Sequence, residues 1–182
     1  MRNILIISGH PSKGSYCHAL TAALYSGLDE NPAVDVQLIS LADCTFDPIL
    51  HQGYKGDQPL EPDLVHAQEL ITWAKEIIWV YPTWWGNMPA LMKGFIDRTF
   101  LPGFAFSFNR FGLPKKLLSG RTSTIITTMD SPPVLMQTAL LDLSVRVFRH
   151  AVLNFCGLKV KKVIRVGSVR RFTPAKRQKW LL

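Results

Sequence analysis

The chain has 182 residues, of which 47% are hydrophobic and 19% charged, and its formal net charge is +8. These values are ordinary for one folded globular domain and exclude an intrinsically disordered chain. The positive excess belongs to residues 151–182, which hold nine Lys or Arg and no acid.

No stretch of the sequence predicts a membrane span, a secretion signal or a metal site. The longest uncharged run, residues 77–92, contains two prolines and is shorter than the ~20 apolar residues of a membrane span. The N-terminal apolar run is too short for a secretory signal. The three cysteines and five histidines show neither CxxC nor HExxH spacing, so we expect no disulfide framework and no bound metal. We therefore expect a soluble, cytoplasmic protein.

Strand and helix patterns alternate through the first half of the chain. Residues 3–7 predict a buried strand, and Ser15 opens a helix that ends before Asn31-Pro32. Residues 34–41 alternate as a strand does, and residues 42–61 are loop-like. A helix follows Pro62, residues 76–81 predict a buried strand, and residues 90–100 predict an amphipathic helix.

The second half continues the alternation after an insertion. Residues 101–119 predict an inserted loop or hairpin, whose phenylalanines, mostly spaced as on a strand, either cover a pocket or pack in a core hairpin. The fourth strand is predicted over residues 122–129, a mostly helical segment over 134–155 and the fifth strand over 160–169. Thr173 as N-cap and Pro174 at the first helical position predict a short final helix.

Five strands alternating with helices predict one doubly wound α/β domain over residues 1–182, with right-handed crossovers. Ligands of such sheets bind beyond the carboxyl ends of the strands. This rule makes three loops candidates for a binding site: residues 8–17, 82–88 and 127–135.

The first loop, SGHPSKGSYC, joins the first strand to the first helix. Its small and hydroxyl residues leave backbone N–H groups free at a helix N-terminus, where the dipole and the donors together favour a phosphate. The sequence has no GxGxxG, and no lysine follows Gly14 as a P-loop requires. An ordinary turn with Ser15 as its N-cap explains the same residues.

The second loop, PTWWGNMP, carries two adjacent tryptophans after a buried strand. Neighbouring side chains of an extended segment point apart, so we do not expect both rings in the core. Aromatic faces at the end of a sheet suit stacking on a planar ligand, and the prolines fix the backbone. The alternative is a satellite hydrophobic cluster or a dimer interface.

The third loop, TTMDSPP, offers hydroxyls, backbone donors and one carboxylate at the end of the fourth strand. These groups can bind a ligand at the edge of the sheet. The alternative is a helix start in which Asp130 or Ser131 is the N-cap.

Together these segments resemble the flavodoxin-like NAD(P)H:quinone oxidoreductases, a family that includes DT-diaphorase and the small bacterial ancillary proteins of potassium-efflux systems. The run IIWVYPTWWGNMPALMKGFIDRTFLPGFAF is its most specific part. Four shorter segments support it: ILIISGHPSKGSYCHAL, DPIL at 47–50, NFCGLKV at 154–160 and TPAKRQKWL near the end. The resemblance implies a flavodoxin-like fold with a five-stranded parallel sheet in the order 2-1-3-4-5.

The resemblance also implies which residues bind a flavin. The family segment that holds the flavin phosphate and ribityl chain corresponds here to His10, Ser15, Tyr16 and Cys17. The family loop that lies along the isoalloxazine ring corresponds here to Pro82, Thr83, Trp84, Trp85 and Gly86. The family loop at the pyrimidine edge of this ring corresponds here to Thr127, Thr128, Met129 and Asp130. The acceptor pocket matches Trp85, Phe106 and Phe108, with the two phenylalanines contributed across a dimer.

The activity that the resemblance implies is that of a homodimer which binds FMN and takes hydride from NADH or NADPH. Two electrons then pass to a quinone-like acceptor by ping-pong kinetics, and no side chain is obligatory as acid or base. FAD is the less expected cofactor, because the chain ends early compared with the FAD-binding members.

Three departures from the family pattern concern the predicted site. Cys17 stands where the motif commonly has Asn, and Met129-Asp130 replaces the paired glycines of DT-diaphorase. Leu135 and Leu141 stand where that enzyme has the Tyr and His proposed to relay a proton. We therefore do not expect that relay here.

The family also suggests a second hypothesis, a regulatory subunit that binds flavin or nucleotide and docks on a membrane potassium-efflux transporter. The basic residues of 151–182 fall on a predicted strand and helix, whereas residues 29–76 carry a net charge of −8. This pattern predicts a polar surface on a folded protein, whose basic side can attract an anionic dinucleotide or a partner. It predicts no nucleic-acid partner.

Overall fold

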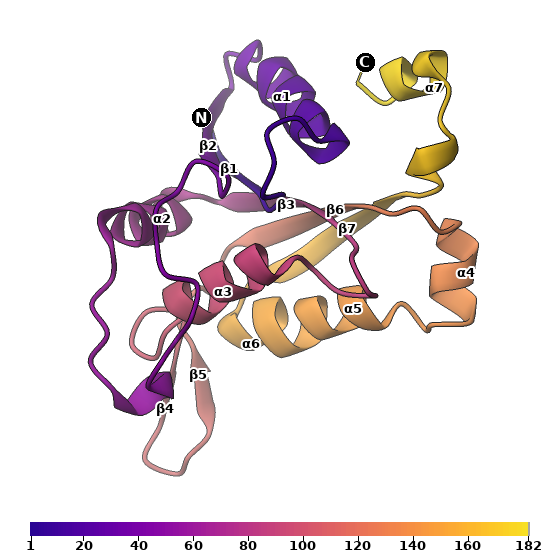
Figure 1. Ribbon diagram of the computed structural model, residues 1–182. Coiled ribbons are helices and arrows are strands. Elements are labelled where there is room, and N and C mark those ends of the chain that lie inside the picture. Colours follow the sequence, from indigo (N-terminus) through magenta and orange to yellow (C-terminus); the bar gives the residue numbers. More distant parts are fainter. Residues whose placement is uncertain (182) are drawn as a thin grey trace.

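A five-stranded parallel sheet forms the centre of the fold in this computed structural model, which describes residues 1–181 (Figure 1). The strands lie in the order β2-β1-β3-β6-β7. Their bounds are Arg2–Ser8 for β1, Val34–Ser40 for β2, Glu76–Pro82 for β3, Thr122–Thr128 for β6 and Lys159–Val166 for β7. Counted without the small hairpin, this is the predicted order 2-1-3-4-5, so the flavodoxin-like arrangement is confirmed.

The middle strand, β3, is buried along its whole length and has helices on both sides. The helix α1 covers one face of the sheet, and α2 and α3 contribute buried residues to the core on the other face. Their bounds are Tyr16–Asp29, Pro62–Trp73 and Ala90–Thr99. In Figure 1, α1 lies above the sheet and α3 below it. A strand covered on both faces needs the continuous apolar run that the sequence shows.

The segment between β6 and β7 is mostly helical, as predicted, but it is broken in the middle. Its parts are α4 (Pro133–Thr138), α5 (Leu143–Val147), a π-helical turn (Phe148–Leu153) and α6 (Asn154–Cys156). Leu141 and Asp142 have positive φ values of 49° and 53°, which interrupt a right-handed helix. The Asp142 carboxylate accepts from Arg165 Nε at 3.1 Å, and this pair holds the break against β7.

After β7 the chain forms two short helices, η3 (Val169–Arg171) and α7 (Pro174–Lys179). The fifth strand ends earlier than predicted, because Ser168 turns the chain with a φ of 59°. Thr173 Oγ1 accepts from the Lys176 N–H at 3.2 Å, which confirms the predicted N-cap. Leu182 lies outside the described residues. Within residues 1–181, no helix is long and apolar enough to cross a bilayer.

Residues 101–119 form a hairpin, so the structure decides between the two predicted alternatives for this insertion. Its strands are β4 (Phe106–Phe108) and β5 (Pro114–Lys116), and they pair antiparallel. The hairpin lies below the sheet in Figure 1, beyond α3 and α6.

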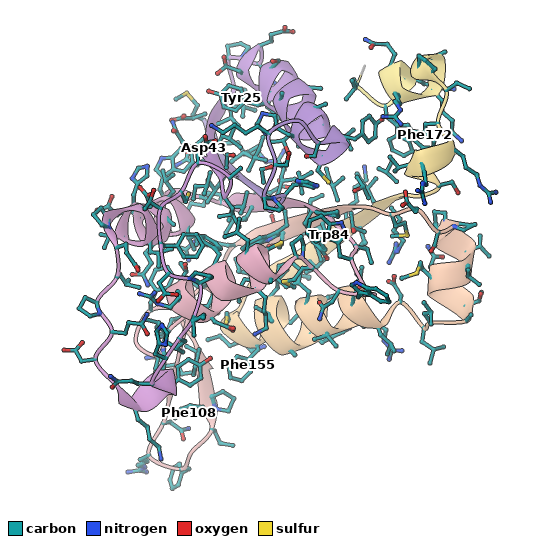
Figure 2. All side chains as sticks on the ribbon, viewed as in Figure 1. Tyr25, Asp43, Trp84, Phe108, Phe155 and Phe172 are labelled. Carbon is teal, nitrogen blue, oxygen red and sulfur yellow. The ribbon has the colours of Figure 1, made fainter. Side chains whose placement is uncertain are left out.

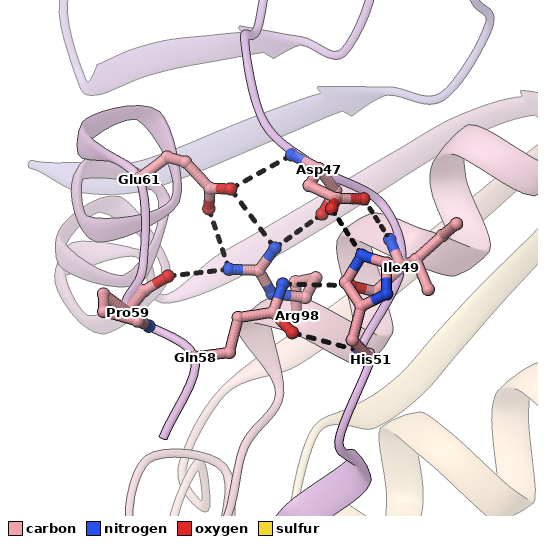
Figure 3. Close-up of polar contacts among 7 residues, drawn as sticks. All are labelled: Asp47, Ile49, His51, Gln58, Pro59, Glu61 and Arg98. Atoms are coloured by element: carbon pink, nitrogen blue, oxygen red, sulfur yellow. Dashed lines mark hydrogen bonds and ion pairs between the residues drawn. The ribbon is translucent and has the colours of Figure 1, made fainter. Parts of the chain in front are cut away.

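The loop of residues 47–61, which we call the strap, is fastened to α3 by one buried arginine (Figure 3). Arg98 is 0% exposed, and its guanidinium donates to the carbonyls of Asp47 at 2.6 Å and Pro59 at 2.8 Å. It also pairs with the Glu61 carboxylate, Nη2 to Oε2 being 2.9 Å. Both ends of the strap are therefore held by the same side chain.

We predict that Arg98→Ala lowers the free energy of unfolding by about 3 kcal/mol, because it leaves a partly buried carboxylate without its partner. Urea denaturation checks this value. The matched control on the same helix is Lys93→Ala, which breaks an exposed pair with Asp97 and should cost less than about 1 kcal/mol. Equal losses for the two variants would contradict the prediction.

Candidate functional site

A cleft of about 400 Å³ lies at the carboxyl ends of β1, β3 and β6, where a doubly wound sheet places its ligand. All three loops that the sequence predicted reach it. Twelve of the thirteen predicted flavin-binding residues line it: His10, Ser15, Tyr16, Cys17, Pro82, Thr83, Trp84, Trp85, Gly86, Thr128, Met129 and Asp130.

The loop after β1 brings the N-terminus of α1 to the cleft. The Gly9 N–H donates to the Val80 carbonyl at 2.8 Å, and a Cβ on Gly9 would lie 2.6 Å from Met92 Sδ. No larger residue fits there without displacing Met92, so the loop stays close to the sheet. Ser15 is the N-cap of α1, and its Oγ accepts from the His18 N–H at 3.1 Å. The turn and N-cap interpretation is thus confirmed, and it leaves the phosphate interpretation open.

His10 stands at the rim of this loop beside the tryptophans. Its Nδ1 accepts from the Ser12 N–H at 2.9 Å, and its ring meets the edge of Trp84 at 5.3 Å between centroids. Burial lowers the pKa of His10, and it outweighs the opposing effect of the Ser12 backbone. The imidazole is therefore neutral at pH 7, with its Nε2–H left as a donor.

The second loop forms a tight turn that we call the tryptophan turn, residues 84–87. Trp84 and Asn87 exchange two backbone hydrogen bonds, at 2.7 and 2.9 Å. Trp85 and Gly86 between them have φ values of 50° and 70°, the geometry of a type I′ turn. Trp85 is fully exposed and Trp84 is 45% exposed, so neither ring lies in the core. The prediction that the core does not hold both rings is confirmed.

The third loop is locked to the second and to the segment after β7. The Thr83 N–H donates to the Thr128 carbonyl at 2.7 Å. Asp130 Oδ1 accepts from the Arg170 N–H at 3.2 Å. The alternative in which Asp130 or Ser131 caps the next helix is wrong, since Pro132 occupies the N-cap position of α4.

Thr127 is the one predicted flavin-binding residue that does not line the cleft. Its side chain is fully buried behind the cleft, and its Oγ1 lies 2.7 Å from Thr83 Oγ1. Successive residues of a strand point to opposite faces, so Thr128 can reach the cleft while Thr127 cannot. Thr127 therefore supports the wall of the cleft from behind.

Cys17 lies at the floor of the cleft with its thiol buried. Its Sγ lies 3.0 Å from Thr128 Oγ1, which joins α1 to the end of β6. Burial raises the pKa of Cys17 to about 11, more than the hydrogen bond to Thr128 lowers it. The side chain is thus a neutral thiol at pH 7.

Tyr16 connects the cleft to the C-terminal helix. Its hydroxyl donates to the Arg177 carbonyl at 3.0 Å, and its ring meets the edge of Phe172 at 6.2 Å between centroids. Burial raises the pKa of Tyr16, although the charge of Arg177 opposes this shift. The basic C-terminal segment is in this way packed against one wall of the cleft.

Four cleft residues were not among the predicted flavin-binding residues. Ser131 lies in the third candidate loop, whereas Met136, Leu140 and Val169 lie outside all three loops. Met136 lies in α4 and Leu140 follows its C-terminal end, and both reach the cleft because the helical segment breaks at Leu141 and Asp142. Val169 reaches it because β7 ends early. No sequence motif marks the helix break or the early end of β7, so the sequence did not indicate that these segments form a wall of the cleft.

The predicted acceptor residues Phe106 and Phe108 lie away from the cleft of their own chain. They line a second space of about 440 Å³, which we call the hairpin groove, together with Tyr54, Phe155 and residues of α3. Figure 2 shows Phe108 and Phe155 at the lower left, far from Trp84. One chain therefore does not bring the two halves of the predicted acceptor pocket together.

A family model described as flavodoxin-like fold matches residues 2–181. The chain belongs to the flavodoxin-like fold family. Among its relatives, the ribosyldihydronicotinamide dehydrogenase (quinone) of Homo sapiens is 30% identical over 114 residues, which are 60% of this chain and 48% of the relative. The chain thus spans about half the length of that relative.

Solved structures match this flavodoxin-like chain over nearly its whole length. Smu.1420 from Streptococcus mutans UA159 is 28% identical with a TM-score of 0.83, covering 98% of this chain and 94% of the other. The FMN-dependent NADH-azoreductase from Bacillus anthracis str. Ames Ancestor, in complex with FMN, has a TM-score of 0.74 at 18% identity, covering 100% and 94%. The second likeness is one of fold.

We predict that Cys17 resists alkylation in the native flavodoxin-like chain. A pKa of about 11 leaves on the order of 100-fold less thiolate at pH 8 than an exposed thiol has, and Cys17 is only 1% exposed. Iodoacetamide labelling followed by peptide mass spectrometry measures this, with urea-unfolded protein as the control. Rapid labelling of native Cys17 at pH 8 would show that the thiol is neither buried nor neutral.

Proposed function

We propose that this flavodoxin-like chain is a flavin-dependent NAD(P)H:quinone oxidoreductase. It takes hydride from NADH or NADPH and passes two electrons, through FMN, to a quinone-like acceptor. The observation that carries the proposal is the cleft, in which a helix N-terminus, an aromatic turn and a loop of polar groups meet. The similarities to a dehydrogenase named for quinone and to an FMN-dependent azoreductase support it.

The start of α1 suits the phosphate end of FMN. The first turn of a helix has N–H groups without partners inside the helix and the positive end of its dipole. Ser15, Tyr16 and Cys17 bring this turn to the cleft wall. Because Ser15 Oγ accepts from the His18 N–H, its hydroxyl hydrogen remains available to a phosphate oxygen.

The space between the tryptophan turn and residues 128–130 suits the flat ring system. Trp84 and Trp85 offer aromatic surface on one side, and Met129 lies on the wall formed by β6. Among the described residues, the N–H groups of Trp85, Gly86 and Asp130 have no backbone partner. These donors can bind the ring's pyrimidine oxygens and stabilise negative charge there.

The protein's part in the reaction is binding, orientation and charge stabilisation. When bound, the flavin supplies the hydride-transfer chemistry. Because the flavin carries the chemistry, no side chain need be an obligatory acid or base. Leu135 and Leu141 have no group that could relay a proton.

We propose a homodimer because the aromatic rings of Phe106 and Phe108 lie in the hairpin groove and not in the cleft of the same chain. A second copy can bring its hairpin to the open side of the cleft. Nicotinamide and quinone then occupy this shared place in turn, which gives ping-pong kinetics. Action in the cytoplasm, as a single domain over residues 1–182, stays a prediction.

We predict that the purified protein binds FMN, is bleached by NADH or NADPH and regains its yellow colour on addition of a quinone. Absorbance near 450 nm follows both steps, and flavin released by heat identifies FMN or FAD. Steady turnover supports the enzyme. Bound FMN with negligible turnover supports the regulatory subunit. A colourless protein that cannot be reconstituted with FMN excludes the enzyme and the flavin-binding form of the regulatory subunit.

We predict that Trp85→Ala raises the dissociation constant of FMN by about tenfold, the effect of losing one aromatic contact, and lowers turnover as well. Fluorescence titration with FMN measures the first effect. The control is Phe111→Ala, which removes an exposed ring from the far end of the hairpin and should change neither value.

We predict that Asp130→Ala, in contrast, keeps FMN bound. Its carboxylate accepts from the Arg170 N–H and does not point to a place that the ring system needs. The same titration should give a dissociation constant within about threefold of wild type, a difference no larger than one weak hydrogen bond. Unchanged FMN binding in Trp85→Ala together with its loss in Asp130→Ala would reverse our assignment of the two loops.

A further inference from the structure

We propose that Tyr54, at the tip of the strap, is a specificity-determining residue for the electron acceptor, and that the strap is built to position it. The inference rests on the proposed function and deepens it. It starts from features to which neither the resemblance nor the cleft assigns a role: a buried arginine, a closed loop and an exposed tyrosine ring.

The base of the strap is fixed to α3 at two successive turns of the helix. Arg98 holds both ends of the strap through the Asp47 and Pro59 carbonyls and the Glu61 carboxylate (Figure 3). One turn earlier, Gly94 leaves room for Pro48, because a Cβ there would collide with the proline ring and its carbonyl. The strap therefore leaves α3 in one defined direction.

The neck of the strap is closed by Gln58. Its Nε2 donates to the Ile49 carbonyl at 3.0 Å, and its Oε1 accepts from the His51 N–H at 3.1 Å. His51 Nε2 in turn lies 2.7 Å from Asp47 Oδ2. A loop with fastened ends and a closed neck presents its tip as a rigid element, as compact surface loops with a function do.

The tip is the short helix η1, Gly53–Lys55, and it places Tyr54 on the hairpin. The Tyr54 ring meets Phe106 edge to face at 6.2 Å between centroids. Phe106 also meets Phe108 at 5.6 Å and Phe155 at 5.2 Å. Phe106 is buried, whereas Tyr54 is 61% and Phe108 59% exposed, so two open rings flank a buried one. In Figure 1 the purple strap lies beside the hairpin.

The hairpin groove has the chemistry of a site for a flat, apolar molecule with carbonyl oxygens. Five aromatic rings line it, and its two charges, Lys93 and Asp97, neutralise each other at 2.7 Å. The Tyr54 hydroxyl adds an uncharged donor on an exposed ring, suited to one quinone oxygen. Because Tyr54 packs on the hairpin, the proposed homodimer places it together with Phe106 and Phe108 at the acceptor side of the other copy's cleft.

The experiment compares Tyr54→Phe and Tyr54→Ala with wild type in the FMN-loaded protein. For 2-methyl-1,4-naphthoquinone, kcat/KM should fall about threefold in Tyr54→Phe, for the hydroxyl, and about tenfold in Tyr54→Ala, for the ring. At saturating NADH, the rate of flavin bleaching and the reduction of ferricyanide, which needs no aromatic pocket, should not change. Phe111→Ala, an exposed ring on the same hairpin outside the groove, should behave as wild type.

The positioning role of the strap is tested by Gln58→Ala, which opens the neck and leaves every groove side chain in place. We expect KM for the naphthoquinone to rise while the maximal rate with ferricyanide and the rate of bleaching by NADH stay at wild-type values. Loss of naphthoquinone reduction, ferricyanide reduction and bleaching by NADH together would show a general structural defect and would count against the inference. An unchanged KM for the naphthoquinone would also count against it.

A binding measurement separates failure of this inference from failure of the proposed function. Calorimetric titration of the protein with 2-methyl-1,4-naphthoquinone does not depend on turnover. Weaker binding by Tyr54→Ala than by wild type supports the inference even if the protein proves inactive. Equal binding by the two proteins, or no binding by wild type, overturns it and leaves Tyr54 as a packing residue for Phe106.

Discussion

Burial of β3 on both faces is the constraint on which the rest of the structure depends. Because β1 and β6 pair with it in parallel, with Ser8 opposite Val80 and Pro82 opposite Thr128, the loops after all three strands leave at one edge of the sheet. The position of the cleft is therefore set by the strand order and does not depend on contacts among the residues that line the cleft. Once the loops are brought together, the Thr83–Thr128 backbone bond fixes their spacing.

The parts of the fold that could be predicted from the sequence are those set by local chemistry. The apolar run of β3, the N-cap at Ser15 and the Thr173-Pro174 helix start each depend on neighbouring residues only. The loops of the cleft could be predicted for a related reason, since the position of a loop after a parallel strand is set by topology. Thr127 shows the limit, because the face to which a strand residue points is decided by the strands beside it.

The parts that could not be predicted depend on residues far apart in the chain. Arg98 fastens a loop that begins 51 positions earlier, and Asp142 pairs with Arg165 23 positions later. A lone arginine on an amphipathic helix is usually a surface residue, so nothing local marks Arg98 as buried. The break at Leu141 and Asp142 contains neither Gly nor Pro, and a single Asp within a helical pattern does not mark a helix end. The cleft wall that the break creates was missed for that reason.

Two residues carry conformational or electrostatic costs that the core does not require. A left-handed φ at Trp85 costs roughly 1–2 kcal/mol that a glycine would avoid. The buried charge of Arg98 is desolvated, and a well-packed apolar side chain can do as well in such a place. Neither residue is therefore explained by the stability of the sheet. Both hold aromatic rings at the surface, Trp85 directly beside the cleft and Arg98 through the strap beside the hairpin groove. Under the proposed function, these rings at the cleft and at the hairpin groove are the surfaces that contact the flat ligands.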